Sequence, residues 1–291
     1  MALLYYWRSD NYWRDLDMGA GYHLNQANPL LHQIEMGDSL WAFTRNRNGQ
    51  YVLAAELIVK AKTQNPPNFR YGRYRLWGDV HHSRYFQIEG QPGVEQIIRV
   101  LSCKTNARAL GQSFQGHNAV KLINQQDHLL LQSAARDLPL EPRARILPEE
   151  RLEAALLLDD RDAVEKLIAA ERPGIAEQRA QYLYTRASAR DRNFVEELQD
   201  LYNGQCQICL WHPRNHYGFT LCHGHHIQWL SRGGEDQLAN MVLVCPNHHT
   251  AIHRIDAPFD FGDMAFDFGR RREYLQLDLH LGKLIEGCSQ R

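Results

Sequence analysis

Two pairs of metal-ligating side chains constrain this chain more than any other feature of its sequence. Cys206 and Cys209 are separated by two residues in CQIC, and Cys245 and His248 are separated by two residues in CPNH. Each pair can sit on a tight turn, so the four side chains can surround one Zn²⁺ tetrahedrally and join two distant segments. Because four protein ligands leave no position for water, the spacing predicts a structural zinc rather than a catalytic one.

The use of cysteine fits metal binding better than disulfides. Four of the six cysteines fall in one histidine-rich stretch, a clustering typical of metal sites. Three of these four belong to the two pairs. The fourth, Cys222, is either a rival zinc ligand or a buried thiol, and we favour the thiol. The opening residues lack the basic and apolar regions of a signal peptide, and no run reaches the roughly 18 apolar residues of a membrane span. We therefore expect a cytoplasmic protein with no membrane partner.

The first hundred residues predict β-structure. DSLWAFTR and YVLAAELIVKA are strand-like runs on either side of NRNGQ, whose Asn-Gly pair predicts a hairpin. YGRYRLWGDVHHSRYFQIEG alternates as a half-buried strand pair would. These patterns favour a small, closed or nearly closed β-barrel.

The rest of the chain favours helices and a small mixed domain. Residues 94–138 contain helical pieces, including QDHLLLQSAARDL, and a second helix is expected from about 175 to 202. The tail APFDFGDMAFDF alternates Phe with acids, as edge strands closing a core would. We predict an α+β protein with three parts: a β-barrel domain, a helical linker and a C-terminal domain, at residues 1–138, 139–185 and 186–291.

A second group of histidines follows the first zinc pair. His249 and His253 are four residues apart, so a helix places both imidazoles on one face. His225 and His226 are adjacent, so on a strand they point to opposite sides, and one can bind a metal while the other faces water. Asn240 stands where the chain leaves the Gly-Gly loop SRGGEDQLAN. This arrangement indicates a second metal site, separate from the zinc.

The segment HHIQWLSRGGEDQLANMVLVCPNHHTAIH resembles the HNH nuclease motif, in which two strands and a helix surround one metal (ββα-metal). The resemblance covers about residues 186–256. The flanking Cys pairs are similar to the zinc-ribbon HNH subgroup of restriction endonucleases, and the histidine pattern is similar to colicin DNases. One position departs from the usual pattern, because His248 stands where a Cys is usual. A Cys₃His set still binds zinc well.

The resemblance implies a role for each residue of the second group. His226 would be the general base that takes a proton from the attacking water, with Asn240 fixing the loop and orienting that base. His225, His249 and His253 would hold a catalytic divalent ion, Mg²⁺ or a transition metal. Three imidazoles suit borderline metals, so Mn²⁺, Co²⁺ or Ni²⁺ should also work. The alternative is a non-catalytic zinc domain in which these histidines are ligands or core residues.

The N-terminal region is rich in aromatic residues. The layout YYWR…MGDSLWAFTR…YVLAAELIVKA…YGRYRLWGDV resembles an EVE-type domain of the PUA superfamily, whose members bind modified bases. Aromatic side chains can stack a base that is flipped out of the duplex. The resemblance implies a reader whose candidate residues are Trp7, Trp41, Trp77, Asp38 and Asp79. The alternative is that most of these aromatic residues form the barrel core.

Basic residues are concentrated in one part of the chain. The formal net charge is −1, yet residues 41–84 hold eight Lys or Arg against two acids. Such an excess attracts phosphate or simply forms a solvated face. Candidate contacts with the DNA backbone are Arg73, Arg75, Arg186 and Arg190.

Together these features resemble modification-dependent, type IV-like restriction endonucleases. The leading hypothesis is an enzyme of phage defence that cuts double-stranded DNA carrying 5-methylcytosine or 5-hydroxymethylcytosine. One alternative is an HNH endonuclease for unmodified sequence or for phosphorothioate DNA. The other is a non-catalytic, zinc-stabilised reader of modified DNA. A single HNH site nicks one strand, so double-strand cutting would point to a homodimer or to two binding events.

Overall fold

A computed structural model describes residues 1–17, 22–141, 144, 162–163, 165–166, 193–229, 232, 234–235 and 237–282. Two compact units divide the chain: Met1–Lys62 with Tyr74–Arg145, and Thr63–Arg73 with Ile146–Arg291. Most of the predicted linker and the first part of the helix predicted from 175 lie outside the described residues, and the predicted domain boundaries stay predictions. Within the described residues, no helix has the length and apolar character to cross a bilayer.

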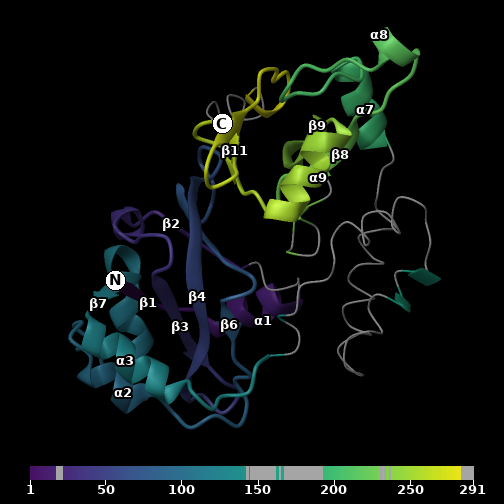
Figure 1. Ribbon diagram of the computed structural model, residues 1–291. Helices are drawn as coiled ribbons and strands as arrows, with labels where there is room; N and C mark the ends of the chain where they lie inside the picture. The colour runs from purple at the N-terminus through teal and green to yellow at the C-terminus, as the bar shows by residue number, and fades with distance from the viewer. Residues whose placement is uncertain are drawn as a thin grey trace. The chain divides into compact units, whose positions relative to one another are not determined.

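The first unit is built on one mixed sheet of seven strands. The strands are β1 (Ala2–Tyr6), β2 (His23–Gln26), β3 (Ser39–Arg45), β4 (Tyr51–Gln64), β5 (Tyr74–Gly78), β6 (Arg84–Tyr85) and β7 (Val120–Ile123). Their order is β2-β5-β4-β3-β1-β7, with β6 beside β4, and β1 runs parallel to β3 (Figure 1). The order has two ends, so the described strands form a curled half-barrel rather than the closed or nearly closed barrel that we predicted.

The Asn-Gly hairpin predicted between the two strand-like runs is confirmed. β3 and β4 pair antiparallel on either side of it. The Asn46 N–H donates to the Gln50 carbonyl at 3.0 Å, and the Asn46 side chain accepts from the Gln50 N–H at 3.0 Å. Gly49 has φ +78°, a conformation that glycine adopts without strain. The turn therefore uses the residue types that its geometry requires.

Helices cover the core of the first unit. They are α1 (Ser9–Asp17), α2 (Glu95–Val100) and α3 (Gln125–Ala134), with short 3₁₀ turns η1 (Pro29–His32), η2 (Leu110–Phe114) and η3 (Gly116–Asn118). Ile98 of α2 and Leu131 of α3 are fully buried in one cluster with Phe43 of β3. Burying each such side chain stabilises the fold by about 1.5–3 kcal/mol. The helical pieces predicted within residues 94–138 are thus confirmed as α2 and α3. α3 begins with a capping box formed by Asn124 and Asp127.

The second unit contains a short hairpin followed by a helix. Its elements are α7 (Asn193–Leu201), α8 (Arg214–Tyr217), β8 (His223–His226), η6 (Leu238–Asn240), β9 (Met241–Val244), α9 (Pro246–Ile255), β10 (Phe259–Asp260), β11 (Ala265–Asp267) and β12 (Arg272–Tyr274). The Phe-rich tail forms β10 and β11, whose Phe259 and Phe266 are buried in the core, as the alternation predicted. Val242 and Ile252 join the same core, which fixes β9 against α9.

Candidate active site

The hairpin and helix of the second unit bring the histidines together. β8 pairs antiparallel with β9, so His225 lies opposite Val242 and His226 opposite Met241. α9 starts at Pro246, directly after the strand and Cys245, with proline at the first helical position where its fixed φ suits a helix. The chain therefore passes from strand to helix without a loop, which holds the helix close to the strand pair.

Three imidazoles converge between β8 and α9. One ring nitrogen from each of His225, His249 and His253 lies within 4.8 Å of the others. The ring centroids of His225 and His253 are 4.8 Å apart, and those of His249 and His253 are 4.6 Å apart. His225 is fully buried, so its position is set by the core. Three imidazole donors at this separation fit a divalent transition-metal ion with positions left for water or substrate.

His226 and Asn240 lie at the end of the same hairpin. The Asn240 side-chain oxygen accepts from the Gln228 N–H at 2.8 Å, and its amide donates to the Gln228 carbonyl at 2.9 Å. The same amide donates to the Glu235 carbonyl at 2.7 Å. His226 is 5% exposed. Asn240 thus closes the loop that follows His226, which is the position that the sequence predicted for it, and its catalytic role stays a prediction.

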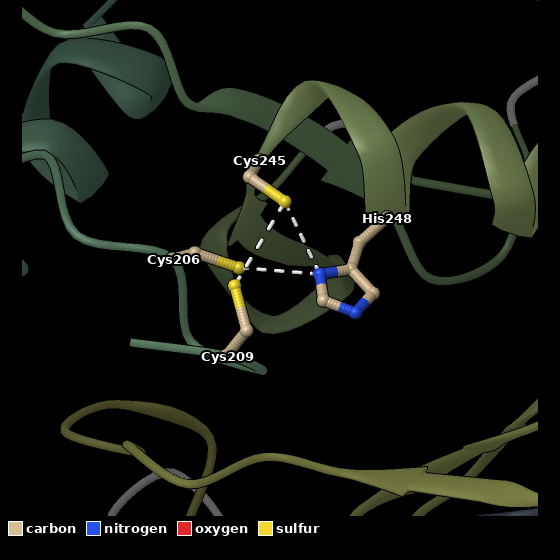
Figure 2. Close-up of side chains that lie close together, drawn as sticks. All are labelled: Cys206, Cys209, Cys245 and His248. Atoms are coloured by element: carbon tan, nitrogen blue, oxygen red, sulfur yellow. Dashed lines mark hydrogen bonds between the residues drawn. The ribbon is translucent and has the colours of Figure 1, made fainter. Parts of the chain in front are cut away.

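The Cys₃His set converges on a second point, as Figure 2 shows. The Sγ atoms of Cys209 and Cys245 are 3.9 Å apart. His248 Nδ1 lies 3.7 Å from the sulfur of Cys206 and 3.2 Å from that of Cys245. Tetrahedral zinc with Zn–S bonds of about 2.3 Å places its sulfur ligands roughly 3.8 Å apart. The donor set and its spacing therefore fit zinc.

Electrostatics favour a thiolate at this cluster. The Cys206 thiol, followed by the imidazole of His248, stabilises the Cys245 thiolate by hydrogen bonding and lowers the Cys245 pKa to about 3. The same pairing raises the pKa of Cys206. Thiolates are the form that binds metal. Cys222 is buried nearby, and burial raises its pKa to about 12, so it is a neutral thiol at physiological pH.

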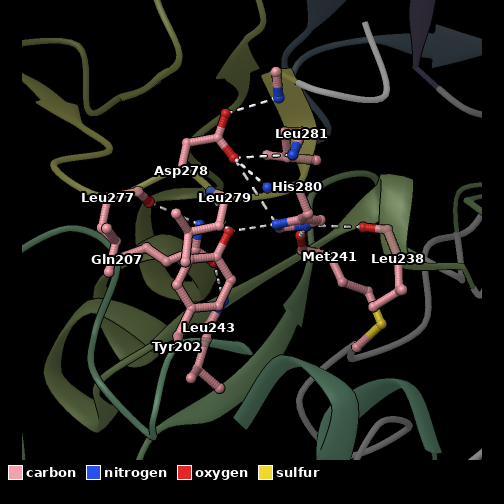
Figure 3. Close-up of polar contacts among 11 residues, drawn as sticks. Tyr202, Gln207, Leu238, Met241, Leu243, Leu277, Asp278, Leu279, His280 and Leu281 are labelled. Atoms are coloured by element: carbon pink, nitrogen blue, oxygen red, sulfur yellow. Dashed lines mark hydrogen bonds and ion pairs between the residues drawn. The ribbon is translucent and has the colours of Figure 1, made fainter. Parts of the chain in front are cut away.

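Sequence reasoning missed Gln207, which follows Cys206 and is one of the two residues between the first pair of cysteines. It is fully buried, and its side-chain oxygen accepts from the Leu243 N–H at 2.7 Å. Its side-chain amide donates to the Leu277 carbonyl at 3.0 Å (Figure 3). Gln207 therefore ties the first Cys turn to β9 and to the C-terminal segment. A glutamine between two cysteines carries no signal of this role.

A second missed group links the C-terminal segment to the loop that carries Asn240. His280 Nε2 donates to the carbonyls of Met241, at 3.0 Å, and Leu238, at 3.2 Å. Its Nδ1 then accepts from the hydroxyl of Tyr202, which in turn accepts from the Leu279 N–H at 2.9 Å (Figure 3). Because Leu238 begins η6, this buried network anchors the turn that ends at Asn240.

Two further missed features border the His cluster. His223 is exposed on the same face of β8 as His225, and its ring centroid lies 5.1 Å from that of His249. Arg232 pairs with Asp256 at 2.8 Å while its guanidinium lies 4.1 Å from the Trp229 ring. The alternation of a strand could have identified His223. The buried Arg232 pair joins the Gly-rich loop to the end of α9.

The predicted reader tryptophans lie in different surroundings. Trp41 is fully buried in the core, where its indole N–H donates to His128 Nδ1 at 3.0 Å. Trp77 is 6% exposed, with the guanidinium of Arg75 over its ring at 5.0 Å. Trp7 is half-buried, and its N–H donates to Asp15 at 3.1 Å. Trp41 is therefore a core residue and Trp77 is also buried, whereas Trp7 is half-buried.

The predicted polar readers serve turns and a terminus. Asp38 accepts from the N-terminal ammonium of Met1 at 2.6 Å. Asp79 accepts from the backbone N–H groups of His81, at 2.8 Å, and His82, at 3.0 Å. Such contacts are typical of carboxylates that stabilise a turn. Any contact of these two with a base stays a prediction.

The predicted backbone arginines differ in exposure. Arg73 is exposed and donates to Gln64 at 2.7 Å. Arg75 is buried and donates to Asn25 at 2.8 Å, and burial lowers its pKa to about 10. Of the two, only Arg73 presents its guanidinium to solvent. Arg186 and Arg190 lie outside the described residues.

Comparison with known proteins identifies a domain within the second unit. Residues 206–254 match the model of the HNH endonuclease family. Anaredoxin from Nostoc sp. (strain PCC 7120) is 29% identical over 69 residues, which are 24% of this chain and 83% of that protein. The type IV phosphorothioation-dependent restriction endonuclease ScoMcrA aligns with 79% of this chain and 46% of its own, at 14% identity and a TM-score of 0.20. A TM-score this low establishes no shared fold.

The matched residues include β8, β9 and all seven side chains of the two clusters. The family match thus agrees with the geometry of the hairpin, the helix and the three converging imidazoles. Residues 206–254 of this chain therefore carry an HNH endonuclease domain.

Proposed function

We propose that this chain is a modification-dependent DNA endonuclease, which recognises 5-methylcytosine or 5-hydroxymethylcytosine and hydrolyses phosphodiester bonds at one HNH site. The catalytic part rests on one observation: His225, His249 and His253 converge beside His226, the last residue of β8. The match of residues 206–254 to the HNH family supports the same conclusion.

The residues of the hairpin divide the chemistry between them. His226 takes a proton from the attacking water, a task suited to an imidazole because its ordinary pKa is near neutral. Asn240 holds the backbone of Gln228 and so fixes the end of β8 that carries His226. A divalent ion held by His225, His249 and His253, Mg²⁺ or Mn²⁺, Co²⁺ or Ni²⁺, would supply charge relief to the phosphate and the leaving 3′ oxygen.

The Cys₃His cluster gives this site its rigidity. Cys206 and Cys209 lie on one turn, whereas Cys245 and His248 lie at the start of α9. These four residues would hold a structural zinc, which would fasten the turn to α9, where His249 follows His248 directly. The helix would then be fixed before any substrate binds, and the imidazoles would keep their separation.

Trp7 is the best placed of the reader candidates. Its ring makes edge contacts with Tyr12, at 5.1 Å between centroids, and Tyr85, at 5.9 Å. Its indole N–H donates to Asp15, whose pKa is raised by burial. Aromatic rings can stack a flipped base, and a carboxyl group beside them can accept a hydrogen bond from its edge. We propose that the modified cytosine stacks at Trp7.

Digestion of matched duplexes tests this function. Each duplex has one sequence and carries cytosine, 5-methylcytosine, 5-hydroxymethylcytosine or a phosphorothioate backbone, and is incubated with Mg²⁺ or Mn²⁺. We expect cutting only where cytosine is modified. Equal cutting of unmodified DNA would contradict the proposed recognition of modified cytosine but not the nuclease activity. Cutting restricted to phosphorothioate DNA would favour that alternative substrate. Binding of modified DNA without cutting, under every ion, favours the non-catalytic reader.

A pair of tryptophan variants locates the reader. Trp7→Ala should lower cutting of modified DNA to the level seen with unmodified DNA. Trp13→Ala is the matched control, because Trp13 is also half-buried in the same unit but packs under the guanidinium of Arg47. An unchanged preference in Trp7→Ala would place the reader elsewhere. Plasmid DNA distinguishes nicks from double-strand breaks, and double-strand breaks would point to a homodimer or to two binding events.

A further inference from the structure

An exposed aromatic segment, residues Leu210–Phe219, joins the first Cys turn to β8. Tyr217 and Phe219 are each 57% exposed, and Leu210 is 44% exposed. Soluble proteins rarely leave large apolar side chains grouped on the surface unless the group binds something. The catalytic scheme and the zinc cluster make no use of these rings.

The segment is held in a fixed shape. The Cys206 N–H donates to the Trp211 carbonyl at 2.9 Å, and the Tyr217 N–H donates to the carbonyl of buried Pro213 at 2.8 Å. Trp211 packs against the core of the unit, and the ring of Tyr217 lies edge-on to it at 6.4 Å between centroids. The rings of Tyr217 and Phe219 are 6.2 Å apart. The exposed rings are therefore presented on a supported turn.

Gly218 makes this presentation possible. It ends α8 with φ +78°, in the left-handed region that side chains rarely adopt, and its N–H donates to the Arg214 carbonyl at 3.0 Å. The reversal leaves Tyr217 and Phe219 on either side of it, both exposed.

The charge around the segment suits a polyanion. No Asp or Glu occurs in the sequence between Asp200 and Glu235. Arg214 and His216 are exposed beside the aromatic rings. Arg214 donates to the neutral side chain of Asn203 at 2.8 Å, and it forms no ion pair with another residue that the structure describes. Phosphate is the common anion that a nuclease meets, and its attraction to such a surface does not depend on sequence.

The segment also lies within reach of the active site along the chain. Phe219 precedes His225 by six residues, so the two are separated by at most about 21 Å of extended chain. One base pair rises about 3.4 Å along the axis of duplex DNA. A DNA strand that runs from the His cluster toward the segment would therefore reach the aromatic rings within about six nucleotides.

We propose that the aromatic segment is a second nucleic-acid contact of this nuclease, in which Tyr217 and Phe219 stack on unpaired bases beside the cut and Arg214 binds a phosphate. The proposal rests on the proposed DNA nuclease function. Stacking needs an open base face, so the contact favours single-stranded or unpaired flanks over a closed duplex. Because every base has such a face, the contact is indifferent to sequence.

Binding of labelled oligonucleotides to the full chain tests the contact. The double variant Tyr217→Ala/Phe219→Ala should bind single-stranded DNA at least about 5-fold more weakly, the smallest loss expected from one stacked base. Its zinc content should be unchanged. Tyr274→Ala is the matched control, since Tyr274 is 49% exposed on β12 of the same unit, and it should bind like the wild type.

Salt dependence tests the phosphate contact separately. A neutralised phosphate contributes about 0.7 to the slope of log Kd against log salt for a single strand. Arg214→Gln should reduce the slope by about that amount, and an unchanged slope removes Arg214 from the contact.

Photochemical cross-linking reads stacking directly. Single-stranded DNA carrying 5-iodouracil should cross-link to Tyr217 or Phe219 on irradiation, as identified by mass spectrometry. Wild-type affinity of the double variant together with an absent cross-link overturns the proposal. A double variant that keeps its DNA affinity but changes from dimer to monomer in sedimentation also overturns it, because the segment then binds a second copy. If the wild type cross-links through the segment but cuts no DNA, the proposed contact stands and the proposed nuclease function is contradicted.

Discussion

The Cys₃His cluster and the His cluster share one helix but have different capacities. His248 and His249 are adjacent on α9, and each joins a different cluster. A helix turns about 100° per residue, so neighbouring side chains point in different directions. The first cluster has four protein donors, whereas the second has three and leaves positions open. The difference teaches that one helix can separate stability from catalysis. Variants of the His cluster should lower cleavage and leave stability unchanged, whereas variants of the Cys₃His cluster should lower stability and, through it, cleavage.

The largest effect is expected at the Cys₃His cluster. Cys206→Ser removes a fully buried ligand, and zinc binding contributes about 10–16 kcal/mol in zinc-finger peptides, as much as a whole domain's stability. We expect loss of the bound zinc and unfolding of the second unit, measured by metal analysis and calorimetry. Cys103→Ser is the control, because Cys103 is a half-buried cysteine of the first unit. A folded, zinc-loaded Cys206→Ser protein would contradict this role.

Loss of the proposed base comes next. His226→Ala should lower single-turnover cleavage by about 10²- to 10⁴-fold, the usual contribution of a positioned base. Its zinc content and Tm should stay close to those of the wild type. His223→Ala, from the exposed position on the same strand, should lose far less activity. Equal losses in the two variants would place the base elsewhere.

A smaller effect is expected from the loop anchor. Asn240→Ala removes one hydrogen bond accepted from Gln228 and two donated to Gln228 and Glu235, at about 1 kcal/mol for each bond. We expect kcat to fall by roughly 10- to 100-fold with little change in KM. Asn240→Asp keeps the acceptor but not the donors, so its kcat should be intermediate. A change in KM alone would mean that Asn240 binds substrate instead.

The smallest effect is expected from His248→Cys. A Cys₄ set binds zinc as readily as Cys₃His, so zinc content and cleavage should stay near wild-type levels. The same change one residue later, His249→Cys, should abolish cleavage with Mg²⁺ and keep the zinc. The comparison is read from metal content and cleavage rate in parallel, and loss of zinc from His249→Cys would show that the two histidines exchange roles.

Local features of the fold could be predicted from sequence. The Asn-Gly turn at Gly49 and its two flanking strands depend on residues only a few positions apart. The same holds for His249 and His253, which are one helical turn apart. The open sheet could not be predicted, because the parallel pairing of β1 with β3 joins segments separated by α1 and β2.

Buried contacts between distant segments also left no pattern. Gln207 and His280 donate hydrogen bonds to backbone carbonyls far along the chain. Every residue has a backbone carbonyl, so the sequence does not show which one is the partner. The sequence of the first unit shows its tryptophans but not which of them are buried. Trp41, a core residue, therefore could not be distinguished from half-buried Trp7.

One measurement tests most directly whether the two clusters hold two metals with separate tasks. The full chain is dialysed against a weak chelator, and its metal content and its cleavage of DNA are measured before and after Mn²⁺ is added. The account predicts one zinc per chain and no cleavage after dialysis, with cleavage restored by Mn²⁺ in the wild type but not in His226→Ala. Cleavage by the dialysed protein, or equal restoration in His226→Ala, would contradict it.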